Sequence, residues 1–325
     1  MSLDADLIVD RRRIRRKLTF WRVVAVLVAI AAVFTGVLAA VRSNLVDVSG
    51  GYVARVTIRG LIRGDTERVE ALERLARSQA KAVIVHVDSP GGTTAGAEQL
   101  YDSLRRVAEK KPLVVVVDGL AASGGYIAAM AADHIIAQGS SIVGSIGVLV
   151  QFPNVSQLLD TIGVKVEEVK SSPLKAAPNG FEPTSPEARA ALQAMVMDSY
   201  AWFRNLVKTR RGMDEAQLEK VADGRVFTGR QGLELKLIDS LGNEQTARQW
   251  LETQKGIDAT TPVRDWDLRS RLSDLPFLHV AMVKVLDAVG LTSLARRVEG
   301  SAMVQAIERL NLDGLLALWH PPVSN

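Results

Sequence analysis

Two apolar runs rich in β-branched residues, each followed at once by a glycine-containing turn, constrain the fold of this chain most. The runs are "AVIVHV" (82–87) and "LVVVV" (113–117), and the turns that follow are "DSPGG" and "DGLAASGG". Continuous apolar runs of this kind predict strands buried on both faces, as in a parallel sheet. Helices are predicted near 94–108 and from about 125 to 132. The alternation of strand and helix predicts a largely parallel α/β core.

Other segments extend this pattern in both directions. The alternating run "YVARVTI" (52–58) predicts a strand, and Asp65 is placed to cap the helix that follows. The segments "HIIA" and "IGVLVQF" predict further short strands. A long helix is predicted from Pro186 to about Arg211, because Ser185 can cap it and proline suits a first helical position.

An apolar run near the N-terminus predicts a membrane anchor. Residues 23–41 contain neither charge nor proline, and as a helix they would span roughly 28 Å, enough for the hydrocarbon core of a bilayer. The basic stretch "RRRIRRK" (11–17) precedes them and predicts a cytoplasmic N-terminus. The rest of the chain is then expected outside the cytoplasm, at the cell (inner) membrane. A cleaved signal peptide is the alternative, but no clear A-x-A site stands directly before Arg42.

The charge distribution argues against nucleic acid as a partner. Residues 1–22 hold seven of the 40 lysines and arginines and three of the 36 acidic residues, so the remaining 303 residues carry 33 charges of each sign. The basic excess therefore belongs to one short tail. The chain has no cysteine, which excludes a cysteine nucleophile and thiolate metal sites.

The predicted organisation is one copy of one domain with an anchor and an extension, since no internal repeat is visible. The predicted segments are a basic cytoplasmic tail (1–22), a transmembrane anchor (23–41), a linker (42–51), a catalytic domain (52–255) and an amphipathic helical C-terminal extension (256–325).

Ser123 is the candidate nucleophile. It stands where a buried strand is expected to end and a helix to begin, and Gly124 follows it. Unobstructed backbone N–H groups at such a turn can stabilise an oxyanion. Gly91 and Gly92 end the neighbouring predicted strand, so their N–H groups could face the same point. The alternative is that these glycines only permit tight turns.

A lysine is the candidate base. The four histidines lie at 86, 134, 279 and 320, and each is more typical of a core or surface position. A lysine can act as a base when burial lowers its pKa from about 10.4 towards 7–8. Lys175 lies in the apolar loop "PLKAAP", whereas Lys170 follows an acidic pair and looks more solvated.

Five motifs in order give the chain a family resemblance. They are "HVDSPGGTTAGAEQLYDSL", "LAASGGYIAAMAADHIIA", "SSIVGSIGV", "KSSPLKAAP" and "ADGRVFTGRQGLELKLIDSLG". Together they resemble the bacterial signal peptide peptidase A family, also called protease IV, in its short single-copy form. The resemblance runs from about residue 52 to 252.

The resemblance implies a Clp protease/crotonase-like α/β fold, a spiral of β-β-α units, here with the N-terminal transmembrane helix and helical C-terminal extension. It implies a Ser/Lys dyad of Ser123 and Lys175, with Ser145 orienting the lysine and Gly91 or Gly92 with Gly124 near the oxyanion. It also implies a ring-shaped homo-oligomer in which the dyad can come from neighbouring subunits. The substrates implied are hydrophobic peptides, chiefly cleaved signal peptides, and the chemistry needs no metal or organic cofactor.

Two departures from the family pattern concern the surroundings of the dyad. Ala176 follows the lysine where an acidic residue is frequent, and Tyr126–Ile127 stands where two tyrosines are frequent.

Two other functions remain open on the same residues. One is a crotonase-like enzyme acting on an acyl-CoA thioester, and the other is a membrane-anchored assembly or adaptor protein with a vestigial site.

Overall fold

The chain divides into two compact units, residues 1–50 and 51–325. The computed structural model describes residues 51–268 and 316–319, together with Lys17 and Trp21. The predicted tail and anchor and all of the linker except Gly51 therefore lie outside the described residues, apart from those two side chains. In the part that is described, no helix is both long and apolar enough to cross a bilayer.

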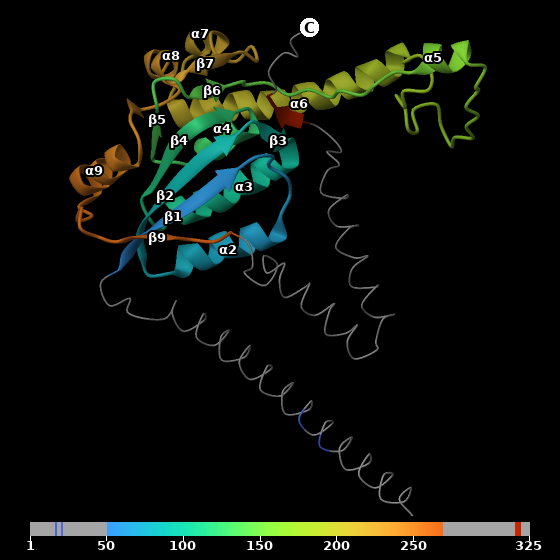
Figure 1. The fold of residues 1–325 in the computed structure, drawn as a ribbon. Helices are drawn as coiled ribbons and strands as arrows, with labels where there is room; N and C mark the ends of the chain where they lie inside the picture. Colours follow the sequence, from blue (N-terminus) through green and yellow to red (C-terminus); the bar gives the residue numbers. More distant parts are fainter. Residues whose placement is uncertain (1–16, 18–20, 22–50, 269–315, 320–325) are drawn as a thin grey trace, which may run out of the picture. The chain divides into compact units, whose positions relative to one another are not determined.

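The second unit is an α/β domain (Figure 1). Its strands are β1 (Tyr52–Arg59), β2 (Ala80–Ser89), β3 (Gly91–Thr93), β4 (Leu113–Ala122), β5 (His134–Ala137), β6 (Ile142–Gly144), β7 (Val226–Thr228), β8 (Ser240–Leu241), β9 (Val263–Asp265) and β10 (Leu316–Leu318). Its helices are α2 (Thr66–Arg77), α3 (Thr94–Ala108), α4 (Gly124–Ala129), α5 (Ser156–Thr161), α6 (Pro186–Arg211), α7 (Glu215–Glu219), α8 (Gly229–Glu234) and α9 (Glu244–Lys255).

The main sheet has the order β7-β6-β4-β2-β1-β9, and β5 and β8 continue it beside β4. All its pairings are parallel except β6 with β7. The predicted parallel α/β core is thus confirmed. The long strand β4 has two neighbours in succession: residues 114–117 pair with β5, and residues 120–122 pair with β6. Its second half carries the chain directly to Ser123.

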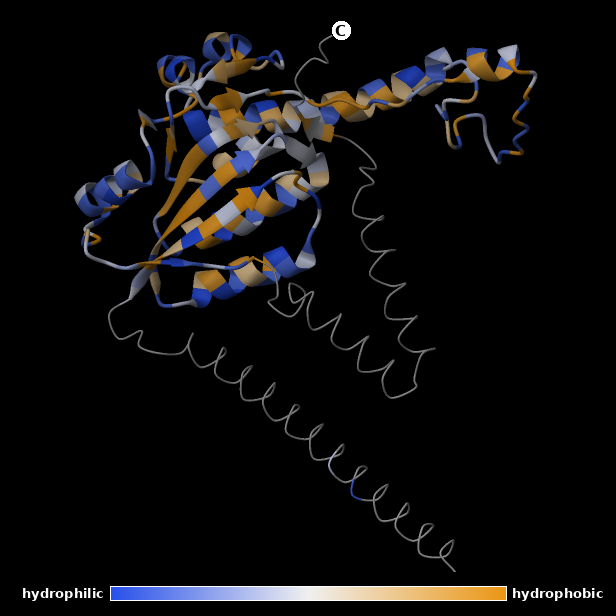
Figure 2. Cartoon of the chain, viewed as in Figure 1, coloured by the Kyte–Doolittle hydropathy of each residue, from blue (hydrophilic) through white to orange (hydrophobic). Residues whose placement is uncertain are grey.

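The continuous apolar runs are explained by burial on both sides of the sheet (Figure 2). On one face Ile84, Val114 and Val116 pack against Ala247 and Leu251 of α9. The residues between them point to the other face, where α2 and α3 are buried through an apolar stripe and α4 is buried on all sides. Strands that are buried on both faces need no alternation of polar and apolar residues, and their continuous apolar runs could therefore be recognised in the sequence.

The expected caps are present. Asp65 accepts a hydrogen bond from the Arg68 N–H at the start of α2, and Ser185 accepts one from the Ala188 N–H at the start of α6. Gly212 ends α6 in the left-handed conformation.

Two expectations need correction. The segment 146–152, predicted as strand, forms only a single bridge at Leu149, and the strand of this region is β6. The described parts of the predicted helical extension contain two strands and no helix: β9 adds to the sheet beside β1, and β10 pairs with β3. These strands are three residues long, so each is too short to show a period.

Candidate active site

Ser123 lies in a strained turn between β4 and α4. Its φ is 53° and its ψ is −116°, a combination that L-residues rarely adopt. Its N–H donates to the Gly144 carbonyl (2.8 Å), and its own carbonyl accepts from the N–H groups of Tyr126 and Ile127. The residue is 1% exposed. The turn therefore fixes the backbone that carries the hydroxyl, as a nucleophile at a strand-to-helix turn requires.

The two glycine turns meet, as expected from the sequence. Ser89, at the end of β2, pairs with Ala121 of β4. A Cβ on Gly125 would stand 2.5 Å from the Ser89 carbonyl oxygen, so only glycine allows this approach. The Ser89 hydroxyl donates to the Gly60 carbonyl (2.6 Å) and accepts from the Gly91 N–H (3.1 Å). Ser89, which sequence reasoning did not single out, thus fixes the shape of the first turn.

The three predicted oxyanion donors are not equivalent. The Gly91 N–H donates to the Ser89 hydroxyl (3.1 Å), so it is engaged within its own turn, and its role at the oxyanion stays a prediction. Gly92 packs so closely on Ile62 that a Cβ would lie 1.8 Å from the Ile62 carbonyl oxygen, and it pairs with Ala317 of β10. The Gly124 N–H is the first of α4 and has no acceptor among the described residues. Gly92 and Gly124 remain as candidate donors.

Ser145 lies near Ser123 because the residue before it, Gly144, is hydrogen-bonded to Ser123. Gly144, which accepts from the Ser123 N–H, is the residue directly before Ser145. The Ser145 N–H donates to the Arg225 carbonyl (2.8 Å), and the residue is buried with a φ of 53°. Its role in orienting a lysine stays a prediction.

Lys175 lies away from Ser123, on a segment that projects from the domain. Residues 152–185, called the arm here, project from the domain at the N-terminal end of α6 (Figure 1). The other end of α6 is anchored, since Phe203 and Val207 are buried and the Arg210 guanidinium donates to the carbonyls of Met130 and Ala132. From Phe203 to Pro186 the helix extends roughly 25 Å. Lys175 is exposed on the arm, so a single chain does not bring it to the buried Ser123.

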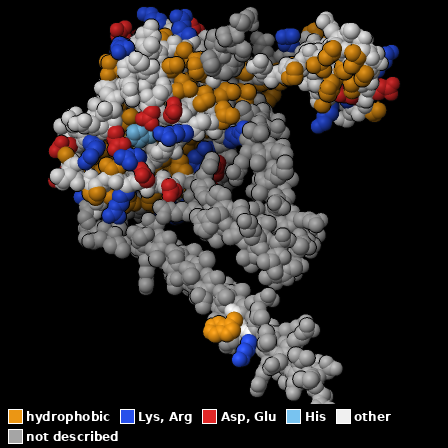
Figure 3. Space-filling view, viewed as in Figure 1, with side chains coloured by type: hydrophobic (Ala, Val, Ile, Leu, Met, Phe, Trp, Pro, Cys, Tyr) orange, Lys and Arg blue, Asp and Glu red, His pale blue; other side chains and the backbone are white. Residues whose placement is uncertain are grey.

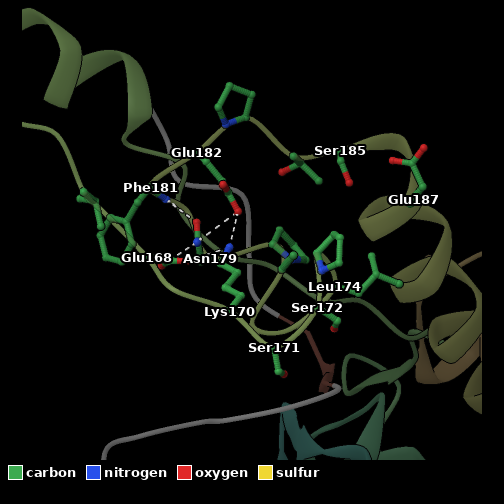
Figure 4. A pocket seen from close by; sticks show the side chains of 16 residues that line it. Glu168, Lys170, Ser171, Ser172, Leu174, Asn179, Phe181, Glu182, Ser185 and Glu187 are labelled. Carbon is green, nitrogen blue, oxygen red and sulfur yellow. Dashed lines mark hydrogen bonds and ion pairs between the residues drawn. The ribbon is translucent and has the colours of Figure 1, made fainter.

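Another lysine of the arm, Lys170, is engaged with carboxylates. Lys170 is paired with Glu168 (2.6 Å) and Glu182 (2.7 Å), and Asn179 donates to both glutamates across the same hollow (Figure 4). These hydrogen bonds, that to Glu168 first, raise the pKa of Lys170. A lysine held in its charged form cannot accept a proton, so Lys170 is unsuited as a base.

The histidines in the described part of the chain have partners away from this turn. His86 lies between Asp118 and Glu244, with both distances 2.8 Å. His134 stacks on Trp250 and contacts the Ser240 hydroxyl. The other two, at 279 and 320, lie outside the described residues.

Two protein-family models match the part of the chain that contains the candidate site. The model of peptidase family S49 matches residues 105–258, and the Clp protease model matches residues 65–140. A Synechocystis sp. protein named, provisionally, as a protease is 38% identical over 208 residues, which cover 63% of this chain and 75% of that protein.

Longer relatives match as well. The chloroplastic serine protease SPPA of Arabidopsis thaliana is 32% identical over 70% of this chain, and Protease 4 of Salmonella typhi is 35% identical over 57% of it. The alignments cover 35% and 30% of those two proteins, so this chain spans about a third of their length.

Proposed function

The chain belongs to peptidase family S49 and is a serine protease, and on this premise we propose that Ser123 is its nucleophile and Lys175 of a neighbouring copy its general base. The observation that carries the proposal is the turn at Ser123. A strained serine there meets a second glycine turn, and Gly124 presents an N–H without an acceptor in the described part of the chain. This is the arrangement that acyl transfer requires.

The base is proposed to come from another subunit because of where the arm lies. Lys175 is exposed at a distance from Ser123 of its own chain, while apolar side chains gather on the arm (Figure 3). The exposed ones are Phe152, Leu158, Ile162, Val164, Val166, Val169, Leu174 and Phe181. An apolar surface of this kind is typical of a protein interface. A head-to-tail ring would cover it and carry each Lys175 to the next subunit's Ser123.

The proposed reaction follows from these roles. The neutral Lys175 amine takes the proton of the Ser123 hydroxyl, whose oxygen attacks the peptide carbonyl carbon. The N–H groups of Gly92 and Gly124 stabilise the oxyanion, and Ser145, beside the nucleophile, holds the lysine. The resulting ammonium protonates the leaving amine as the C–N bond breaks. Water, deprotonated by the lysine, then hydrolyses the acyl-enzyme.

The proposed setting is the outer side of the cell membrane. The apolar run 23–41 would anchor the chain, and the basic stretch before it would keep the N-terminus in the cytoplasm. A tethered peptidase is well placed to degrade hydrophobic peptides released into the bilayer, such as cleaved signal peptides. A relative in Enterococcus faecium, 32% identical over 192 residues, carries the provisional name of signal peptide peptidase.

The proposal is tested by peptidase assays on the detergent-solubilised full chain with a hydrophobic fluorogenic peptide. Ser123→Ala and Lys175→Ala are each expected to lower kcat/KM by roughly 10³-fold or more, because each removes one half of the dyad. Gel filtration should show that both variants still assemble.

Lys170→Ala is the matched control. It removes a lysine from the same arm that is bound by two glutamates, so its kcat/KM should stay within a few-fold of wild type. Equal activity in Lys175→Ala and wild type would contradict the assignment of the base. Equal activity in all variants, including Ser123→Ala, would contradict the assignment of the nucleophile.

A further inference from the structure

Helix α9 lies on one face of the main sheet and is attached there in two ways. Along its length, Ala247 and Leu251 pack into the apolar core formed with the strands. At its first residue, Glu244, the attachment is polar: the carboxylate accepts two hydrogen bonds from the Arg55 guanidinium and lies 2.8 Å from the ring of His86 on β2. The start of the helix is therefore held by charged groups and not by apolar packing.

The ring of His86 stands between two carboxylates from different elements. Its Nδ1 atom lies 2.8 Å from the Oδ1 atom of Asp118 on β4, and its Nε2 atom lies 2.8 Å from the Oε2 atom of Glu244 on α9. The His86 side chain is only 14% exposed, so water has little access to replace either partner. This one ring thus links β4 to the start of α9.

Only one protonation state of the ring satisfies both contacts. An ionised carboxylate only accepts hydrogen bonds, whereas a neutral imidazole has one N–H and one nitrogen with a lone pair. In the neutral ring, one nitrogen would therefore face a carboxylate oxygen with no proton between the two acceptors. The doubly protonated ring donates from both nitrogens, so the links to Asp118 and Glu244 coexist only in that state.

The surroundings of the ring are acidic on balance. The charged side chains near it come from five elements and are Arg55, Arg59, Asp88, Asp118, Glu244 and Asp265. Four of these six are acidic, an imbalance that a positive charge on the ring reduces. The hydrogen bonds from Arg55, foremost, lower the pKa of Glu244, which keeps this partner of the ring ionised.

We propose that His86 is a proton-dependent clasp that holds the start of α9 to β4 and opens when the ring loses its second proton. Histidine is the side chain whose charge ordinarily changes between about pH 5 and 8. The clasp is therefore closed on the acidic side of the ring's titration and one of its two contacts is lost as the pH rises. This inference goes beyond the proposed peptidase function and does not depend on Ser123.

Amide hydrogen exchange followed by mass spectrometry measures the clasp at α9 itself. The detergent-solubilised full chain is exchanged at several values from about pH 5.5 to 9, and the rates are converted to protection factors to remove the intrinsic effect of pH. In the wild type, the protection of residues 244–255 is expected to fall roughly tenfold over this range, because one charge-assisted contact is lost. The protection of α3, which takes no part in the clasp, should be unchanged.

Asp118→Asn is the sharpest variant, because it allows the neutral ring to satisfy both contacts. The asparagine amide can donate to one ring nitrogen while the other ring nitrogen donates to Glu244. The protection of α9 in this variant should therefore stay constant as the pH rises. His86→Gln, which is uncharged at every pH, should give lower protection of α9 than the wild type at about pH 5.5 and no dependence on pH.

Three results would each overturn the inference. They are a protection of α9 in the wild type that does not change with pH, a loss in Asp118→Asn as large as that in the wild type, and a loss that extends equally to α3. The last result would show that the whole domain titrates and not the clasp. The comparison of the wild type with Asp118→Asn decides the question even if His86→Gln fails to fold, which thermal melts would reveal.

Discussion

Ser123 and Ser145 share a positive φ, which is costly for residues other than glycine. Each has a φ of 53°, and such a residue costs about 1–3 kcal/mol, which the surrounding structure must offset. At Ser123 the offset comes from the strand pairing of β4 with β6 and from the bond to the Gly144 carbonyl. Strain kept at the proposed nucleophile is consistent with a functional turn.

This strain gives a prediction at the residue scale. Ser123→Gly and Ser123→Ala both remove the hydroxyl, but glycine relieves the backbone strain and alanine does not. We expect the glycine variant to be more stable than the alanine variant by about 1 kcal/mol, measured as the free energy of unfolding in urea.

The control for that comparison lies in α4. Ala129→Gly, in ordinary helical backbone, should lower stability by about 1 kcal/mol, the opposite sign. An alanine variant at 123 that is as stable as the glycine variant would show that the turn is not strained in solution.

At the scale of elements, a network of charges ties α9 and β9 to the sheet. The Arg55 guanidinium, on β1, binds Glu244 at the start of α9 through two hydrogen bonds (2.6 and 2.8 Å) and Asp265 of β9 through a third (2.9 Å). The Glu244 carboxylate is also hydrogen-bonded to the His86 ring of β2. The hydrogen bonds from Arg55, foremost, lower the pKa of Glu244 below its ordinary 4.5.

This shift sets the pH dependence of stability. Because the folded-state pKa of Glu244 is depressed, its contribution is fully present above the unfolded value and is lost as pH falls through the folded value. Glu244→Gln should therefore destabilise the protein at pH 7, and the gap between variant and wild type should narrow below about pH 4.5.

Thermal melts of both proteins from pH 7 to pH 3.5 would measure that gap. Glu234→Gln, at the end of α8 and away from the network, is the control and should show a small gap at every pH. A gap for Glu244→Gln that is constant over the range would refute the role assigned to the carboxylate.

The elements were predictable where their signal is local. The runs in β2 and β4 are apolar throughout because both faces of the sheet are covered, and α6 carries its own cap at Ser185. β9 and β10 have no such signal, since each is three residues long and exists only through pairing with β1 or β3. Their partners are distant in sequence, so tertiary contacts alone define them.

The candidate site was predictable in part for the same reason. The positions of Ser123 and the two glycine turns follow from the rule that parallel strands end at one edge of the sheet. That the Gly91 N–H is used by Ser89 does not follow from any pattern, because it depends on the conformation of one turn. The distance of Lys175 from Ser123 depends on where the arm projects, which no local sequence feature specifies.

At the scale of the whole molecule, the two residues of the proposed dyad lie apart within one copy of the chain. Ser123 is buried in the domain, and Lys175 is exposed on an arm whose apolar side chains also face outwards. An assembled ring would cover those side chains and complete the dyad between copies. Activity and assembly should then be inseparable.

Mixed assembly of two inactive variants tests this central claim most directly. Ser123→Ala and Lys175→Ala chains, co-expressed with different tags and purified together, can form complete sites only where a Lys175→Ala chain lends its serine to the lysine of a Ser123→Ala neighbour. Random mixing predicts recovery of roughly a quarter of wild-type activity, and the double variant mixed with either chain should recover none. Mixed rings that remain inactive, beside active wild-type rings prepared in the same way, would contradict a dyad shared between subunits.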